Sequence, residues 1–229
     1  MPLIERELKG VRVSERWLQA YLRCTGAGDW PATRLPPLAL QIAVAPLHMA
    51  VMADRAFPFR PLGIVHQSQQ VQQWRMLAAH ASYDLKVFTS AARAERKGTS
   101  FGLVTEARQA GERVWRSEVR VLSFSATPAQ TKHGAPAERH TPDDEALQSA
   151  ALRVPESVGR EYARIAADYN PVHVHALLAR LFGFRRAIAH GTWTLARALF
   201  LTGLPGASRY ELEARFRRPV DLPSTIRVR

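Results

Sequence analysis

The chain has 229 residues, of which 46% are hydrophobic, so it can bury the core of one large domain or of two small ones. Its single cysteine, Cys24, excludes an internal disulfide and favours a reducing compartment such as the cytoplasm. The net charge of +12 comes mainly from arginines dispersed along the chain. Because no zinc-ligand spacing or helix-turn-helix pattern accompanies them, we expect no nucleic-acid partner.

The first half of the sequence predicts a helix followed by antiparallel strands. The amino terminus contains acidic residues and no long apolar segment, which argues against a secretory signal. Residues 35–52 are apolar, but three prolines interrupt them, so we expect no membrane span. We interpret residues 36–52 as a central helix that Pro46 kinks. Four strand-like stretches follow, with a turn at residues 109–112: residues 63–76, 84–94, 99–110 and 113–124.

A segment without hydrophobic periodicity divides the chain. Residues 125–145 are rich in proline, alanine, threonine and charge, which is typical of an exposed or disordered linker. The sequence therefore predicts three parts: an amino-terminal domain at residues 1–124, the linker, and a carboxy-terminal domain at residues 146–229.

Two helices are expected on either side of an Asn-Pro step. Apolar residues recur at helical spacing from residue 155 up to Asp168. Pro171 cannot donate a backbone hydrogen bond, and it disfavours the helical conformation at Asn170. A second helix is expected over residues 173–182, with Gly183 as its stop and one apolar stripe formed by Val174, Leu177, Leu178 and Leu181.

The turn between these helices carries polar side chains that can converge. Asp168, Asn170 and His173 lie within the segment DYNPVH. A carboxylate and an imidazole that lie close together can share one water molecule and exchange protons with it near neutral pH. Asn170 is better interpreted as a loop-forming or water-positioning amide than as a proton carrier.

A third helix is expected after His190. Residues 192–203 are apolar on almost every side, which predicts a buried helix. Its amino end, at His190 and Gly191, offers unpaired N–H groups to an oxygen that becomes negative. Residues 209–220 and 224–229 then read as strands. Because the last of these ends within an alternating pattern, we expect either further strands beyond it or a second chain that completes the sheet.

The segments DYNPVH, GF and IAHG, in this order and spacing, resemble the MaoC-like dehydratases, which include the (R)-specific 2-enoyl-CoA hydratases. The resemblance is close over residues 160–199. It implies an α+β double hotdog, in which antiparallel sheets wrap around central helices in two halves. The first half contains no DxNPxH segment, so it is expected to be a degenerate partner of the carboxy-terminal half, which reads as incomplete at its end.

The resemblance also implies roles for residues of the motif. Asp168 and His173 become the catalytic acid/base pair, and the Gly191 N–H becomes the donor to the thioester oxygen. We expect four further residues to bind substrate: Asn170, Arg185, Arg186 and His190. No cofactor and no metal are implied. His173 and His175 alone do not make a metal site, because no carboxylate or thiolate cluster joins them.

The expected activity is addition or removal of water across the 2,3 double bond of an acyl thioester. The carrier is coenzyme A or an acyl carrier protein, and homo- or hetero-oligomers are expected through the sheets. Two alternatives remain open: a hotdog thioesterase, and a catalytically inactive acyl-binding or assembly subunit. His48, His66 and His175 are expected to be structural or surface groups.

Overall fold

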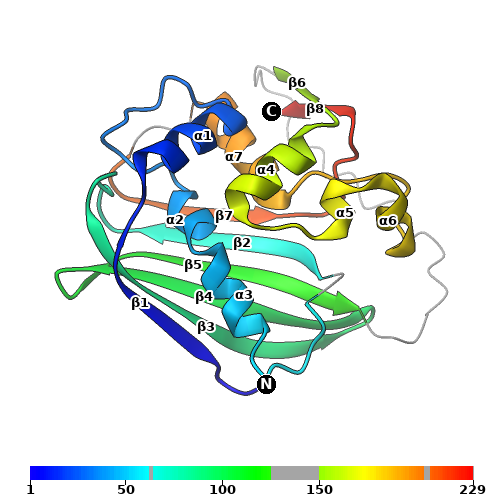
Figure 1. The fold of residues 1–229 in the computed structure, drawn as a ribbon, viewed down its shortest axis with the longest axis horizontal. Coiled ribbons are helices and arrows are strands. Elements are labelled where there is room, and N and C mark those ends of the chain that lie inside the picture. The colour runs from blue at the N-terminus through cyan, green and yellow to red at the C-terminus, as the bar shows by residue number, and fades with distance from the viewer. Residues whose placement is uncertain (62–63, 125–149, 204–206, 229) are drawn as a thin grey trace, which may run out of the picture.

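The structure is a computed structural model that describes residues 1–61, 64–124, 150–203 and 207–228. Its main element is a six-stranded antiparallel sheet in the order β1-β3-β4-β5-β2-β7 (Figure 1). The strands span Glu5–Arg12 (β1), Val65–Gln73 (β2), Ser82–Glu95 (β3), Gly98–Gln109 (β4), Glu112–Phe124 (β5) and Tyr210–Arg215 (β7). The expected linker at residues 125–145 lies outside the described residues.

Alternation along the strands gives the sheet an apolar face and a charged face. On β4 and β5, Leu103 and Trp115 are buried on the face toward the helices. The opposite face carries ion pairs from Glu118 to Arg116 and Arg120, both at 3.3 Å. Alternation of this kind is typical of a half-buried antiparallel strand. The expected turn at residues 109–112 is confirmed, because β4 ends and β5 begins there.

The central helix of the first half is broken, as the sequence predicts. It consists of α2 (Ala39–Ala43) and α3 (Ala45–Met52), which lie across the sheet (Figure 1). Pro46 lies in the first turn of α3, where its missing N–H costs no helical hydrogen bond. One polar contact joins this helix to the sheet: His48 Nε2 lies 2.8 Å from Thr105 Oγ1.

Two amino-terminal elements were not expected from the sequence. Strand β1 forms the edge of the sheet beside β3, and most of its residues are exposed, so it lacks a strong apolar period. Helix α1 (Glu15–Thr25) begins at Ser14, whose hydroxyl accepts the Trp17 N–H at 3.2 Å. It ends at Gly26 in the left-handed region, with φ of 67°. Both ends therefore carry ordinary capping signals.

The second half places its helices on one side of the main sheet. These are α4 (Val158–Ala166), α5 (Pro171–Val174), α6 (Ala176–Leu181) and α7 (Gly191–Leu201). Strands β6 (Ala150–Val154) and β8 (Ser224–Val228) form a separate two-stranded sheet. Strand β7 pairs with β2 of the first half over six residue pairs, so both halves contribute to one sheet. None of the helices in the described ranges is long and apolar enough to span a membrane.

The expectation of a single helix over residues 173–182 is wrong. His175 is extended between α5 and α6, and its Nδ1 accepts the N–H groups of Leu177 and Leu178 at 3.2 and 3.4 Å. The expected apolar stripe is also not buried as a whole, since Leu177 and Leu181 are 64% and 79% exposed. A side-chain cap inside the segment thus ends one helix and starts another.

Candidate active site

Local hydrogen bonds build the turn that carries Asp168. Helix α4 ends at Ala167, which is in the left-handed region with φ of 51°. The Asn170 N–H then donates to Asp168 Oδ1 at 3.1 Å, and Asn170 Oδ1 accepts the Val172 N–H at 3.4 Å. Asn170 therefore serves as the amino-terminal cap of α5, which is the loop-forming role expected for its amide. The Asp168 side chain remains 48% exposed.

The hydrogen bonding of His173 fixes its tautomer. Its Nδ1 lies 2.9 Å from the Ile188 carbonyl oxygen. A carbonyl can only accept, so Nδ1 carries the proton. Burial lowers the pKa of His173, although the nearby Asp168 carboxylate opposes this effect. The ring is therefore neutral near pH 7, and its Nε2 has a free lone pair that can accept a proton.

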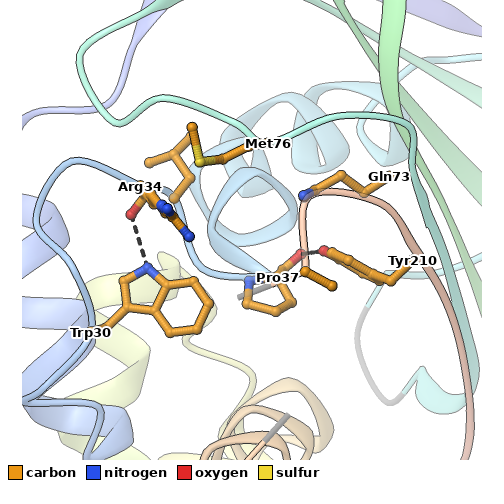
Figure 2. A pocket seen from close by; sticks show the side chains of 8 residues that line it. Trp30, Arg34, Pro37, Gln73, Met76 and Tyr210 are labelled. Carbon is orange, nitrogen blue, oxygen red and sulfur yellow. Dashed lines mark hydrogen bonds between the residues drawn. The ribbon is translucent and has the colours of Figure 1, made fainter. Parts of the chain in front are cut away.

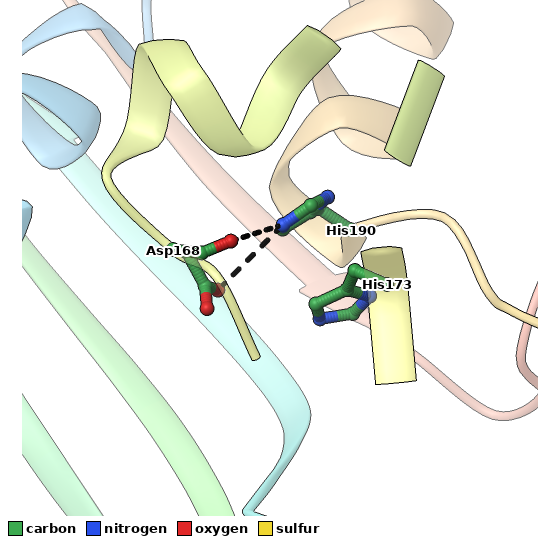
Figure 3. Close-up of side chains that lie close together, drawn as sticks. All are labelled: Asp168, His173 and His190. Atoms are coloured by element: carbon green, nitrogen blue, oxygen red, sulfur yellow. Dashed lines mark hydrogen bonds and ion pairs between the residues drawn. The ribbon is translucent and has the colours of Figure 1, made fainter. Parts of the chain in front are cut away.

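His190 lies next to Asp168 and His173, at the start of α7. Its side chain is only 3% exposed, and its Nε2 donates to the Asp168 carbonyl oxygen at 3.1 Å (Figure 3). The rings of His190 and His173 stack with their centroids 3.8 Å apart. Burial, followed by the effect of His173, lowers the pKa of His190. His190 therefore holds the motif turn against the start of α7.

The three side chains form one cluster. One nitrogen from each histidine and one oxygen of Asp168 all lie within 4.8 Å of one another. The spacing would allow these three groups to hold a metal ion, and His175 is not one of them. A carboxylate beside a neutral imidazole is equally suited to orient and deprotonate a water molecule.

The buried neutral histidines predict acid sensitivity of the fold. Burial, followed by the effect of the nearby His66, lowers the pKa of His48 to about 4. The pKa of His190 is also lowered. In the unfolded chain each titrates near its usual value of about 6.5. Below that pH the unfolded state binds more protons, so the free energy of unfolding should fall as pH drops. Each such histidine contributes a slope of about 1.4 kcal/mol per pH unit.

Urea unfolding at pH 7 and pH 5 measures this effect. We expect lower stability at pH 5, and a smaller difference between the two pH values for His48→Gln. The exposed His80 supplies the matched control, because His80→Gln should leave the difference unchanged. Equal or greater stability of the parent chain at pH 5 would contradict the prediction.

Gly191 begins α7 beside the cluster. Among the hydrogen bonds of the described residues, none uses its N–H, which is therefore available to a ligand. A side chain at this position would meet Phe216 Cε1 at 3.2 Å and His66 Nδ1 at 3.3 Å. His66 comes from β2 of the first half and was not expected near the motif. Only the strand register, which the local sequence does not encode, brings it there.

The structure does not join the two expected arginines to the cluster. Arg185 and Arg186 are exposed on the loop between α6 and α7. No ion pair is seen for either of them within the described ranges. In the sequence they lie between the motif and Gly191.

A separate hollow lies between the loop after α1 and the end of β2 (Figure 2). Its volume of about 10 Å³ has room for one water molecule. Trp30 Nε1 donates to the Arg34 carbonyl at 3.0 Å, and the Tyr210 hydroxyl donates to the Pro37 carbonyl at 3.3 Å. These bonds occupy the Trp30 and Tyr210 donors of the wall. The hollow is thus too small for an acyl substrate.

Known proteins resemble both the sequence and the fold. Residues 137–229 match the family described as MaoC like domain. The 3-hydroxyacyl-thioester dehydratase X of Mycobacterium tuberculosis is 30% identical over 192 residues, which cover 82% of this chain and 67% of that protein. A crystal structure of HtdX from Mycobacterium tuberculosis has a TM-score of 0.80 and 25% identity, covering 96% of this chain and 85% of that one.

A third protein identifies the architecture. A Mycobacterium tuberculosis protein with a double hotdog fold superposes with a TM-score of 0.56 at 15% identity, covering 98% of this chain and 82% of that one. Together with the joined sheet, this confirms the expected α+β double hotdog. The chain belongs to the MaoC-like dehydratase family, as its DYNPVH segment predicts.

Proposed function

We propose that this protein is a hydratase or dehydratase that adds water to, or removes it from, the 2,3 double bond of an acyl thioester. The observation that carries the proposal is the placement of the Asp168 carboxylate beside a neutral His173 whose Nε2 is free. The relative named as a 3-hydroxyacyl-thioester dehydratase supports the same reaction class.

In the proposed hydration, one water molecule reacts at the cluster. Asp168 accepts a hydrogen bond from one O–H group of the water, whose hydrogen stays on the oxygen, and His173 Nε2 takes the other proton as the water oxygen bonds to C3 of the enoyl thioester. The resulting enolate places negative charge on the thioester oxygen, where the Gly191 N–H donates to it. The imidazolium then returns its proton to C2, giving a 3-hydroxyacyl thioester, for which we propose the (R) configuration. Dehydration follows the same steps in reverse.

The environment of the cluster suits this chemistry. A buried imidazole with a lowered pKa is unprotonated near pH 7 and can act as a base. A helix amino terminus with a free N–H stabilises developing negative charge, and loss of one such donor typically costs about 3 kcal/mol of transition-state stabilisation. The reaction uses acid/base groups alone, so the cluster needs no metal to perform it.

A direct assay tests the proposal. The purified protein is mixed with crotonyl-CoA or a longer enoyl-CoA, and the absorbance of the conjugated thioester is followed. We expect the absorbance to fall and an (R)-3-hydroxyacyl-CoA to accumulate. Release of free thiol instead would indicate a thioesterase. An unchanged substrate in the presence of folded protein would favour the inactive acyl-binding alternative.

We further propose that exposed arginines help to recruit the carrier, coenzyme A or an acyl carrier protein. Residues 169–209 contain five arginines and no acidic residue. Four of these arginines, Arg180, Arg185, Arg186 and Arg209, are exposed and can attract phosphate or carboxylate groups. The attraction should weaken with salt, because the screening length is roughly 4 Å at about 0.5 M ionic strength. The single cysteine favours a cytoplasmic location for such a reaction.

Charge reversal tests this recruitment. The double variant Arg185→Glu with Arg186→Glu should raise the Michaelis constant for enoyl-CoA several-fold and leave turnover at saturation nearly unchanged. High salt should have the same effect on the parent chain. The matched control reverses Arg96 and Lys97, an exposed basic pair at the turn between β3 and β4. Equal Michaelis constants for the parent and the Arg185/Arg186 variant would contradict this role.

A further inference from the structure

His66 has a ring that is held in one orientation within the first half of the chain. It lies on β2, and its Nε2 is 3.0 Å from the Ser68 carbonyl oxygen. The carbonyl can only accept, so Nε2 carries a proton. Burial lowers the pKa of His66 to about 4. The ring is therefore neutral near pH 7, and its Nδ1 is an unprotonated acceptor.

The unprotonated edge of this ring faces the start of α7. A Cβ atom built on Gly191 would lie 3.3 Å from His66 Nδ1 and 3.2 Å from Phe216 Cε1. The rings of His66 and Phe216 contact each other, with centroids 4.4 Å apart. Phe216 follows β7, so the two rings come from opposite halves of the chain. Together they form a wall against the Cα of Gly191.

His66 is also close enough to the motif to share its electrostatics. The charge states of Asp168 and His173 both affect the pKa of His66, in opposite directions. A ring anchored by Ser68 on a central strand is a firmer support than a loop side chain, because β2 pairs with β5 on one side and β7 on the other.

We propose that His66 is a positioning residue through which the first half holds the Gly191 N–H in place for the reacting thioester oxygen. This inference rests on the proposed hydratase function, and it adds a residue outside the DYNPVH and IAHG segments. It also replaces the expectation that His66 is only a structural or surface group. The shape of the ring against Gly191 carries the effect, and Phe216 completes the wall.

Two substitutions separate the ring from its hydrogen bond. His66→Phe keeps a ring beside Gly191 and Phe216 but cannot donate to Ser68. His66→Gln keeps a donor that can reach Ser68 but removes the ring. We expect turnover to fall about tenfold in His66→Gln and less in His66→Phe, since misplacing an oxyanion donor costs part of the hundredfold or more lost on its removal. The Michaelis constant should stay within about threefold, because the interaction is made in the transition state.

A second measurement does not depend on activity. In a ¹⁵N-labelled protein, the Gly191 amide resonance should shift in His66→Gln and stay in place in the control His80→Gln, which changes an exposed histidine of the same half. An unmoved Gly191 resonance in His66→Gln would overturn the inference. A change in the Michaelis constant alone would also overturn it, as would an equal loss of turnover in His66→Phe and His66→Gln. Absence of hydratase activity in the wild-type protein would refute the proposed function. The Gly191 resonance would still show whether His66 positions the Gly191 N–H.

Discussion

Replacement of Asp168 by Asn, or of His173 by Ala, is expected to lower turnover about a hundredfold or more, the usual scale for positioned acid/base groups. Asp168→Asn retains the oxygen that accepts the Asn170 N–H, so the turn can persist while the charge is lost. His173→Ala removes the base together with its bond to Ile188. Because both groups act on one water, the double variant should be far from additive.

Steady-state hydration of crotonyl-CoA measures these losses, and melting curves confirm that each variant is folded. Asp29 is exposed in the first half, so Asp29→Asn provides a control for removing a carboxylate. We expect this control to match the parent chain. Full activity in either Asp168→Asn or His173→Ala would refute the assignment of the catalytic pair.

The second large effect is expected at Gly159. This residue lies outside the DYNPVH segment but contacts the backbone of that segment. A Cβ atom there would lie 2.0 Å from the His173 carbonyl oxygen and 3.0 Å from Leu222 Cδ1. Helix α4 must therefore move away from α5 in Gly159→Ala. Overpacking of this kind typically costs about 1–3 kcal/mol, and the shift should also displace His173 and lower turnover.

Urea unfolding and turnover are measured together for this variant. Gly28→Ala is the matched control, because a Cβ at Gly28 meets nothing within 4 Å. It should be as stable and as active as the parent chain. If Gly159→Ala also matched the parent chain in both properties, the close contact between α4 and α5 would not be what holds the motif in position.

The parts of the fold that the sequence predicts are those set by local signals. Pro46 breaks the central helix, and the turn at residues 109–112 separates two alternating strands. Strand β1 is not predicted from the sequence because an exposed edge strand has little apolar alternation. The break between α5 and α6 at His175 is not predicted either, because an imidazole that caps a helix is a weaker signal than the apolar spacing around it.

The candidate site likewise combines residues that the local sequence predicts with residues that only tertiary packing brings there. Asp168 and His173 lie within six residues, so an Asn-Pro turn is sufficient to predict that they converge. The Asn170 side chain, expected to join them, instead caps α5. The bond from His190 to the Asp168 carbonyl spans 22 residues and depends on where α7 packs. His66 is more distant still, because it reaches Gly191 only through the pairing of β2 with β7. Strand register over such separations depends on the whole sheet.

Hydration in water labelled with ¹⁸O tests the central claim most directly. Crotonyl-CoA is incubated with the protein in this water, and the products are analysed by mass spectrometry. A hydratase that uses the Asp168 and His173 pair places one ¹⁸O atom in the 3-hydroxyl of an intact 3-hydroxybutyryl-CoA, and the Asp168→Asn variant should form this product at least about a hundredfold more slowly. Label found in the carboxylate of free crotonate, with release of coenzyme A, would contradict the account, as would a failure to incorporate label at all.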